Sequence, residues 1–89
     1  MGTPEQNLLV LLLNRELYEK YSDLVDYKNI KETYRELSFL FETLNVLHKE
    51  HARSFSVDEL AGFFFTKYPD SDRQLYDGLF KQLSSIVIS

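Results

Sequence analysis

The chain contains no cysteine and very little glycine or proline. Without cysteine it can form neither a disulfide framework nor a thiolate metal site, and an intracellular setting is the simpler interpretation. Its three glycines, Gly2, Gly62 and Gly78, lie far apart, whereas a phosphate-binding loop needs several glycines close together. The sequence therefore offers no nucleotide-binding loop.

Long apolar runs and clustered positive charges are also missing. The longest wholly apolar run, Leu8 to Leu13, is far shorter than the roughly 18 to 20 residues that span a bilayer. The N-terminus carries Glu5 and has neither a basic region nor a small-residue cleavage site, so it does not resemble a signal peptide. The 14 acidic and 10 basic side chains give a net charge of -4, and the basic ones are scattered. We expect a cytoplasmic protein that binds neither membranes nor nucleic acid strongly.

Apolar and aromatic side chains, by contrast, are plentiful. They make up 44% and 15% of the 89 residues, a composition that favours a packed core over disorder. A chain of this length is expected to form one domain, residues 1–89, that buries only about 60 to 65% of its unfolded surface.

Helix signals recur along the whole chain and predict an all-α domain. We expect a compact bundle of about five helices with one long, central, amphipathic helix. Three pairs with the spacing of a capping box predict helix starts, and Pro69 is expected to end the fourth helix. These pairs are Thr3 with Gln6, Ser56 with Glu59, and Ser71 with Gln74. The expected helices run from about Pro4 to Leu13, Arg15 to Val25, Ile30 to His51, Ser56 to Tyr68 and Ser71 to Leu83.

The spacing of apolar residues also predicts which side chains are buried. The first helix is apolar all round and is expected to be covered on most sides, and Asp26 to Lys31 is expected to be a polar connector anchored by Ile30. In the second helix, the side chains expected to face inward are Leu17, Tyr21, Leu24 and Val25. The expected core consists of Leu9, Leu12, Leu37, Phe41, Leu44, Leu60, Phe64, Leu79 and Leu83.

Candidate ligand sites each have a simpler explanation. His48 and His51 have a spacing that suits one metal ion, but no third ligand is evident, so we favour capping of the helix end or solvation. Asp70–Asp72 begins like a calcium loop, yet Leu75 and Lys81 occupy the positions that require glycine and glutamate. These aspartates are better explained as first-turn charges.

The remaining acidic side chains do not indicate catalysis. They have no companion nucleophile or base, and we expect them to form a solvated face. They are Asp23, Asp26, Glu32 and Glu36. We therefore expect no enzymatic activity, cofactor or metal in this segment, and rank a small enzyme last among the alternatives.

Apolar residues in excess of one core stripe are the candidates for partner binding. Three consecutive helical residues, Phe63 to Phe65, point about 100° apart, so one stripe cannot bury all of them. If Phe64 faces the core, Phe63 or Phe65 remains for a second buried face or for an exposed contact. Phe39 and Val46 lie off the stripe of the long helix and could meet a neighbouring helix or a partner.

The C-terminal stretch, Ser84 to Ser89, reads Ser-Ser-Ile-Val-Ile-Ser. Because natural termini are seldom apolar, we expect the chain to be the front end of a longer protein. A final turn packed onto the core is the alternative.

Taken in order, the segments resemble the N-terminal domain of DnaB-type replicative helicases, especially those of bacteriophages. The likeness covers about residues 4 to 83 and is one of pattern. The matching features are the apolar helix Asn7–Asn14, Leu17 with Tyr18, the connector with Tyr27, the long helix Tyr34–His51, and the turn leading into Phe55–Leu60.

This resemblance implies a non-catalytic domain of a hexameric DNA helicase. In that family the N-terminal domains form a collar and contact primase, while ATP, Mg²⁺ and DNA bind in a C-terminal RecA-like domain that this segment does not include. Much of the dimer contact comes from a following helical hairpin, so the segment alone is expected to be a monomer or weak dimer. The alternative is a free-standing adaptor or inhibitor, such as one encoded by a phage, that binds a host protein.

Overall fold

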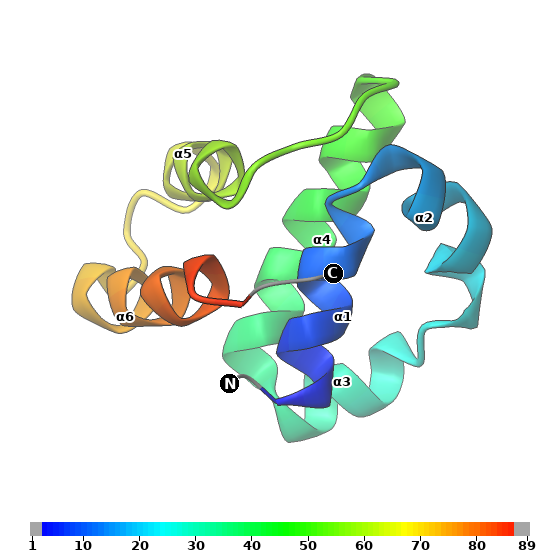
Figure 1. The fold of residues 1–89 in the computed structure, drawn as a ribbon. Coiled ribbons are helices and arrows are strands. Elements are labelled where there is room, and N and C mark those ends of the chain that lie inside the picture. The colour runs from blue at the N-terminus through cyan, green and yellow to red at the C-terminus, as the bar shows by residue number, and fades with distance from the viewer. Residues whose placement is uncertain (1–2, 87–89) are drawn as a thin grey trace.

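The computed structural model describes residues 3–86, and every regular element in that range is helical (Figure 1). Six α-helices and one short 3₁₀ helix follow one another along the chain. Their bounds are α1 Pro4–Leu12, α2 Arg15–Tyr21, η1 Ser22–Leu24, α3 Tyr27–Thr33, α4 Arg35–Glu50, α5 Val57–Lys67 and α6 Arg73–Ser84. The expected all-α fold is confirmed, with one α-helix more than expected.

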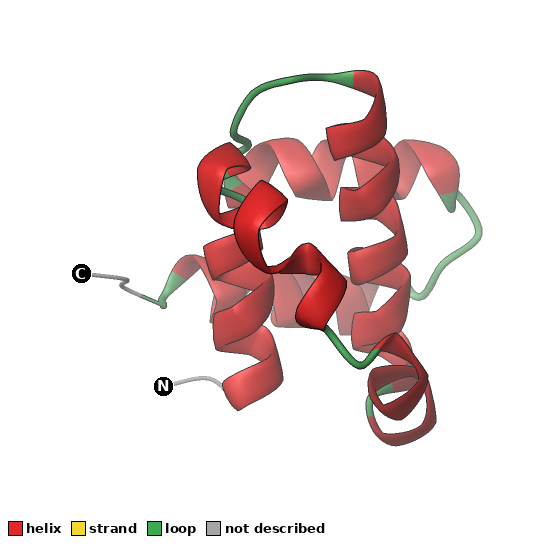
Figure 2. Cartoon of the chain, turned by 90° about the vertical axis from the view of Figure 1, so that its right-hand side faces the viewer, coloured by secondary structure: helices red, strands yellow, loops and turns green. Residues whose placement is uncertain are grey.

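The longest helix, α4, is the axis of the domain. It contacts α1, α3 and α5, while α6 packs against α5 and α1. In Figure 1, α2 and α3 lie on one side of α4, and α5 and α6 lie on the other. Figure 2, turned by 90° from Figure 1, shows the short loops that join these helices. The expected long central helix is confirmed.

Two of the three expected capping boxes are present. The Gln6 amide donates to the Thr3 hydroxyl and the Thr3 amide donates to the Gln6 side chain, both at 3.2 Å. Ser56 and Glu59 make the same reciprocal pair, both at 3.1 Å. Each box satisfies amide groups that the first turn of a helix leaves without an internal partner.

The third expected box, Ser71 with Gln74, is wrong. Asp72 caps α6 instead, because its carboxylate accepts from the Leu75 amide at 3.1 Å. Ser71 still belongs to the preceding turn, where its amide donates to the carbonyl of Tyr68 at 3.1 Å. A carboxylate at this position also interacts favourably with the helix dipole.

The expected polar connector Asp26–Lys31 is also wrong, because most of it forms α3. Asp26 caps this helix by accepting from the Asn29 amide at 3.0 Å. The chain then breaks at Tyr34, whose φ of -132° and ψ of 69° are not helical, so α4 begins at Arg35 and not at Ile30. The end of the long helix near His51 is confirmed.

The core lies where the helices on both sides meet α4. Eight of the nine core residues expected from the spacing are buried, whereas Leu79 is only half-buried at the edge of α6. Gln6 in α1 donates to the side chain of Gln82 in α6 at 3.0 Å, which links the first helix to the last. Of the expected C-terminal stub, Ile86 packs against the core, and residues 87–89 lie outside the described range.

Candidate functional site

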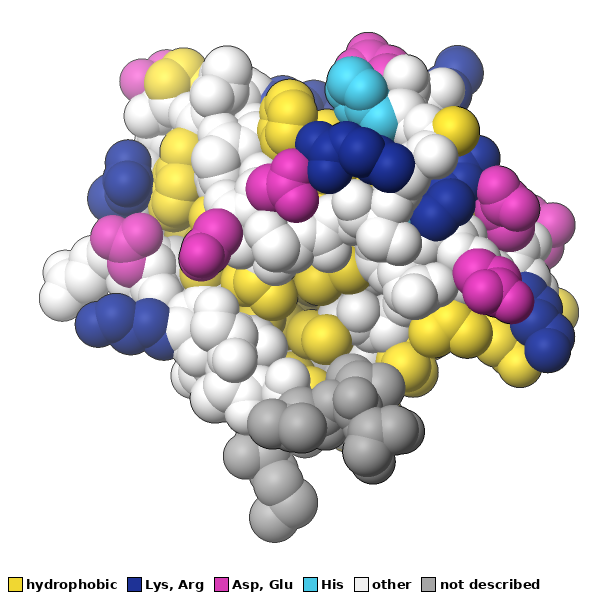
Figure 3. All heavy atoms as spheres, turned by 45° about the horizontal axis from the view of Figure 1, so that its top comes forward, with side chains coloured by type: hydrophobic (Ala, Val, Ile, Leu, Met, Phe, Trp, Pro, Cys, Tyr) yellow, Lys and Arg dark blue, Asp and Glu magenta, His cyan; other side chains and the backbone are white. Residues whose placement is uncertain are grey.

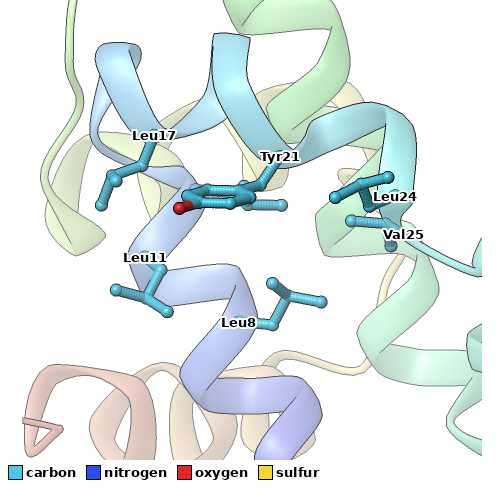
Figure 4. Close-up of a pocket in the computed structure, with 7 residues that line it drawn as sticks. Leu8, Leu11, Leu17, Tyr21, Leu24 and Val25 are labelled. Carbon is cyan, nitrogen blue, oxygen red and sulfur yellow. The ribbon is translucent and has the colours of Figure 1, made fainter.

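An apolar groove lies between α1 and the α2–η1 segment. It has a volume of about 420 Å³. Its lining consists of leucines, one valine and one tyrosine, whose side chains converge from both sides (Figure 4). They are Leu8, Leu11, Leu12, Leu17, Tyr21, Leu24 and Val25. The groove suits apolar side chains of a binding partner more than a polar substrate.

Two side chains expected to face the core, Leu24 and Tyr21, line the groove instead and leave it open. Leu24 is 77% exposed and Tyr21 is 40% exposed, so their expected burial is wrong. The α-helix ends at Tyr21, and Ser22–Leu24 continues as a 3₁₀ turn, which tightens the chain and changes the direction of its side chains. Leu17 and Val25 are half-buried. This wall of the groove therefore carries apolar surface that the core does not use.

The opposite wall of the groove is α1. Leu9 and Leu12 are buried in the core, as predicted. Leu8, Val10 and Leu11 are half-buried, and Pro4 is the only exposed residue of this helix, so the helix is covered on most sides as expected. The all-round apolar run indicates contacts on more than one face, because a helix with one contact face needs only one apolar stripe.

Polar contacts from Arg15 fix α2 against the end of α4. Its guanidinium donates to the backbone carbonyls of His48 and, at 3.1 Å, of His51, and so caps carbonyl groups that the end of a helix leaves free. The same side chain pairs with Glu19 at 2.7 Å. The loop after α4 is held as well, since the Arg15 amide donates to the Ser54 hydroxyl at 2.8 Å.

Two tyrosines attach the segment around the groove to α4 through one amide. The hydroxyl groups of Tyr18 and Tyr27 both donate to the side-chain oxygen of Asn45, at 2.9 and 3.3 Å. Burial raises the pKa of both tyrosines above its ordinary value, so both remain donors at neutral pH. The groove wall is thus supported from behind by hydrogen bonds.

His48 is the most unusual polar side chain of the domain. It is only 2% exposed, its Nε2 lies 2.7 Å from the carbonyl oxygen of Leu12, and its ring stacks on Tyr18 with centroids 3.9 Å apart. Nδ1 is buried and has no hydrogen-bond partner among the described residues. Burial lowers the pKa of His48, although the Leu12 carbonyl opposes this shift. The expected capping or solvated role is therefore wrong for this residue, which joins α4 to α1 as a neutral core histidine.

Nothing in the described range gathers ligands for a metal. No group of three or more His, Asp or Glu side chains lies close enough to hold an ion in residues 3–86.

The acidic side chains expected to form a solvated face are all exposed, and Asp26 additionally caps α3. None of the described helices is both long and apolar enough to cross a bilayer.

The four residues proposed for partner binding have different surroundings. Phe63 is 40% exposed, with its ring 6.5 Å from Phe55 and 6.2 Å from His51. Val46 is exposed to a similar degree. Hydrophobic side chains are visible among charged ones on the face in Figure 3, including its right-hand edge, the side on which α2 lies in Figure 1.

Phe65 and Phe39 are largely committed to contacts within the domain. Phe65 is half-buried, lies 5.6 Å from the ring of Phe80, and carries the guanidinium of Arg73 over its face at 4.0 Å. Phe39 is half-buried and packs edge-on against Tyr68 at 5.6 Å. Of the two outer phenylalanines of the α5 run, Phe63 is thus the one with free surface.

Comparisons with protein-family models, curated proteins and solved structures find no significant match to this chain.

Proposed function

We propose that this chain is a non-catalytic docking domain that binds proteins through apolar surface left open by its core. The observation that carries the proposal is the groove between α1 and the α2–η1 segment, where a leucine 77% exposed borders a hollow of about 420 Å³. Burying such a side chain on association stabilises a complex by about 1.5 to 3 kcal/mol. Exposed apolar surface beside an apolar hollow is typical of an interaction site.

For the wider role we favour the N-terminal domain of a DnaB-type replicative helicase. The support is the pattern of residues 4 to 83, namely an apolar first helix, a long central helix and a capped helix beginning after Phe55. In this proposal the domain works in the cytoplasm of a bacterial or phage-infected cell, contributes to a collar and contacts primase. ATP and Mg²⁺ would act in a separate C-terminal domain of the parent protein.

A free-standing adaptor or inhibitor is the second candidate. The closure of the fold favours it, because the Gln6–Gln82 hydrogen bond and the contacts between α1 and α6 complete one core within residues 3–86. The same docking surface would then bind a host protein.

The reading frame that encodes the chain distinguishes these two candidates. A phosphate-binding loop encoded downstream in the same frame would support the helicase assignment. A stop codon directly after this segment would exclude it and leave the adaptor.

Variants of exposed residues test docking itself. Phe63→Glu and Val46→Glu replace exposed side chains on α5 and α4, and Leu24→Ser does so at the groove. At least one of them should abolish assembly of the longer parent or its pull-down of the cognate primase while leaving the melting temperature near that of the wild type. Leu75→Ser, at an exposed leucine of α6, is the matched control. Unchanged primase binding and assembly in all three variants would contradict a docking role for these surfaces.

A further inference from the structure

The segment that forms the groove carries most of the net negative charge of the chain. Residues 4–26, which include α1, α2 and η1, hold five acidic and two basic side chains and so have a net charge of -3. The rest of the chain, with nine acidic and eight basic side chains, is nearly neutral. The apolar groove therefore lies in a part of the molecule with a net negative charge.

Two exposed acidic side chains of α2 and η1 are next in the sequence to residues that line the groove. Glu16 directly precedes Leu17, and Asp23 directly precedes Leu24; both acids are exposed. Neither is within ion-pair distance of a basic side chain in the described range, whereas Glu19 is paired with Arg15. Both acids are thus left without an ion pair within residues 3–86, in a segment where Glu19 is paired with Arg15 and Lys20 supplies one further positive charge.

Lys20 shows that a cation can also contact the lining of the groove. Its ammonium group lies 5.3 Å from the ring centre of Tyr21, which is partly exposed. A positive charge over an aromatic face is attracted by the ring, and the attraction increases when water is excluded. A basic side chain from a partner would find the same kind of contact at this rim.

From this arrangement we infer that the groove receives a basic amphipathic α-helix from a protein partner. Its apolar side chains, spaced at i, i+3 or i+4 and i+7, would fill the hollow, while lysines or arginines beside them would face Glu16 and Asp23. Because α1 has nine residues and α2 has seven, the walls are about 10 to 14 Å long and match two to three turns of a helix. This inference rests on the proposed docking function and specifies its partner.

The charge of the rim argues against the other possible occupants. A second copy of the chain would bring two acidic borders together, and like charges at an interface oppose association. The carboxylate of a fatty acid would meet the same repulsion. The test distinguishes a second copy from the helix by sedimentation.

The test uses the chain of residues 1–89 and two synthetic peptides of about four helical turns. One peptide has leucines at i, i+3, i+4 and i+7 flanked by lysines, and its matched partner has glutamates in place of the lysines. Fluorescence anisotropy should show the lysine peptide binding about tenfold more tightly at low salt. Added salt should reduce that preference, because exposed charges are screened. Amide NMR shifts should change at Leu8, Leu17 and Leu24.

Three variants sharpen the result. Leu24→Ser should weaken binding of the lysine peptide about tenfold, whereas Leu75→Ser, at the exposed leucine of α6, should leave it unchanged. Glu16→Lys combined with Asp23→Lys should reverse the preference between the two peptides. Equal affinity for both peptides, or shifts confined to residues outside the groove, would overturn the inference. Sedimentation that reveals a dimer abolished by Leu24→Ser would overturn it in favour of a second copy.

Failure here is separable from failure of the proposed function. If neither peptide binds the groove but Phe63→Glu abolishes binding of primase, only the basic-helix inference fails. If no surface variant affects any protein partner, the docking function itself fails.

Discussion

The two sides of α4 bury their apolar residues to very different extents. On the side of α5 and α6, aromatic rings pack on one another: Phe64 lies 4.4 Å from Tyr76 and 5.8 Å from Phe80, and all three are buried. On the side of α2 and η1, apolar side chains line an open groove, where Leu24 is 77% exposed and Tyr21 is 40% exposed. The α5–α6 side has a packed aromatic centre with Phe63 and Leu75 exposed at its surface, while the α2–η1 side retains an apolar groove that a partner can cover.

The difference shows that similar apolar patterns need not have the same function. In α5 and α6 the apolar stripes meet each other, so burial stabilises the fold directly. The side chains that hold α2 in place are polar or amphipathic, namely Arg15 and Tyr18, and Tyr18 donates to Asn45 of α4. Polar attachment leaves the leucines of this segment available for binding.

The largest expected effect disrupts the core that both sides share on α4. Phe41 is 1% exposed, and its ring contacts Tyr27 edge-on at 6.0 Å. Phe41→Ala should lower the free energy of unfolding by about 3 to 5 kcal/mol, because it removes buried surface and leaves a cavity. Urea denaturation followed by circular dichroism measures this. A loss under about 1 kcal/mol would mean that α4 is not the centre of the core.

A smaller effect compares the two outer phenylalanines of α5. Phe65→Ala should cost about 2 kcal/mol, since its ring packs on Phe80 and under Arg73, while Phe63→Ala should cost about 1 kcal/mol or less. Parallel thermal and urea unfolding of both variants gives the difference. Equal losses would show that both rings belong to the core, and would remove Phe63 from the docking surface.

The pH dependence of stability tests the junction between the two sides. Because the pKa of His48 is lowered in the folded state, the unfolded chain takes up a proton first as the pH falls. The free energy of unfolding should therefore decrease as the pH falls below about 6.5, towards the lowered pKa of the folded state. Urea denaturation at several pH values between about 7.5 and 5 measures how steeply the free energy of unfolding depends on pH. This range extends about one to two pH units around the ordinary pKa of histidine.

His48→Gln is the control for this prediction. Its amide can still donate to the Leu12 carbonyl, but it cannot take up a proton in this range. The variant should lose the part of the slope that begins near pH 6.5. If its stability follows the same pH profile as the wild type, His48 is not the group responsible.

The N-terminal cap of α6 provides the next prediction, a loss of about 1 kcal/mol in the free energy of unfolding. Asp72→Ala should destabilise the domain by about that amount, because it removes the acceptor of the Leu75 amide and a favourable charge at the N-terminus of α6. Ser71→Ala should cost less, since that hydroxyl caps nothing and has no hydrogen-bond partner in the described structure. Thermal unfolding of the pair compares them. The opposite ranking would restore Ser71 as the cap.

Local patterns were sufficient to predict most of the fold. The capping residues Thr3 and Ser56 act within four residues of themselves, and the stripe of α4 repeats at helical spacing, so both could be inferred without knowing the neighbours. The break at Tyr34 could not be inferred in this way. The apolar spacing continues through it unchanged, although Asp26 was an available signal for a separate α3.

The candidate site was harder to predict because it depends on which apolar residues find a partner within the domain. Leu24 and Leu83 look alike in the sequence, yet one is 77% exposed and the other 1%. The position of α2 is decided by long-range contacts, such as the bond of Arg15 to the end of α4, that no local pattern reveals. The burial of His48 has the same origin, since its hydrogen-bond partner, Leu12, is far away in the sequence.

The smallest expected effect on stability is at the groove itself. Leu24→Ser removes a side chain that is 77% exposed, so the free energy of unfolding should change by no more than about 0.5 kcal/mol. Leu83→Ser, at a buried leucine of the packed side, is the contrasting variant and should cost at least about 3 kcal/mol, because it leaves both a cavity and a buried hydroxyl. Urea denaturation of the two proteins at one temperature measures the contrast. A loss at Leu24 approaching that at Leu83 would mean that the η1 leucine is buried in solution and that the groove is closed. A negligible loss, together with weakened binding of the lysine peptide, would separate the role of Leu24 in docking from any role in folding.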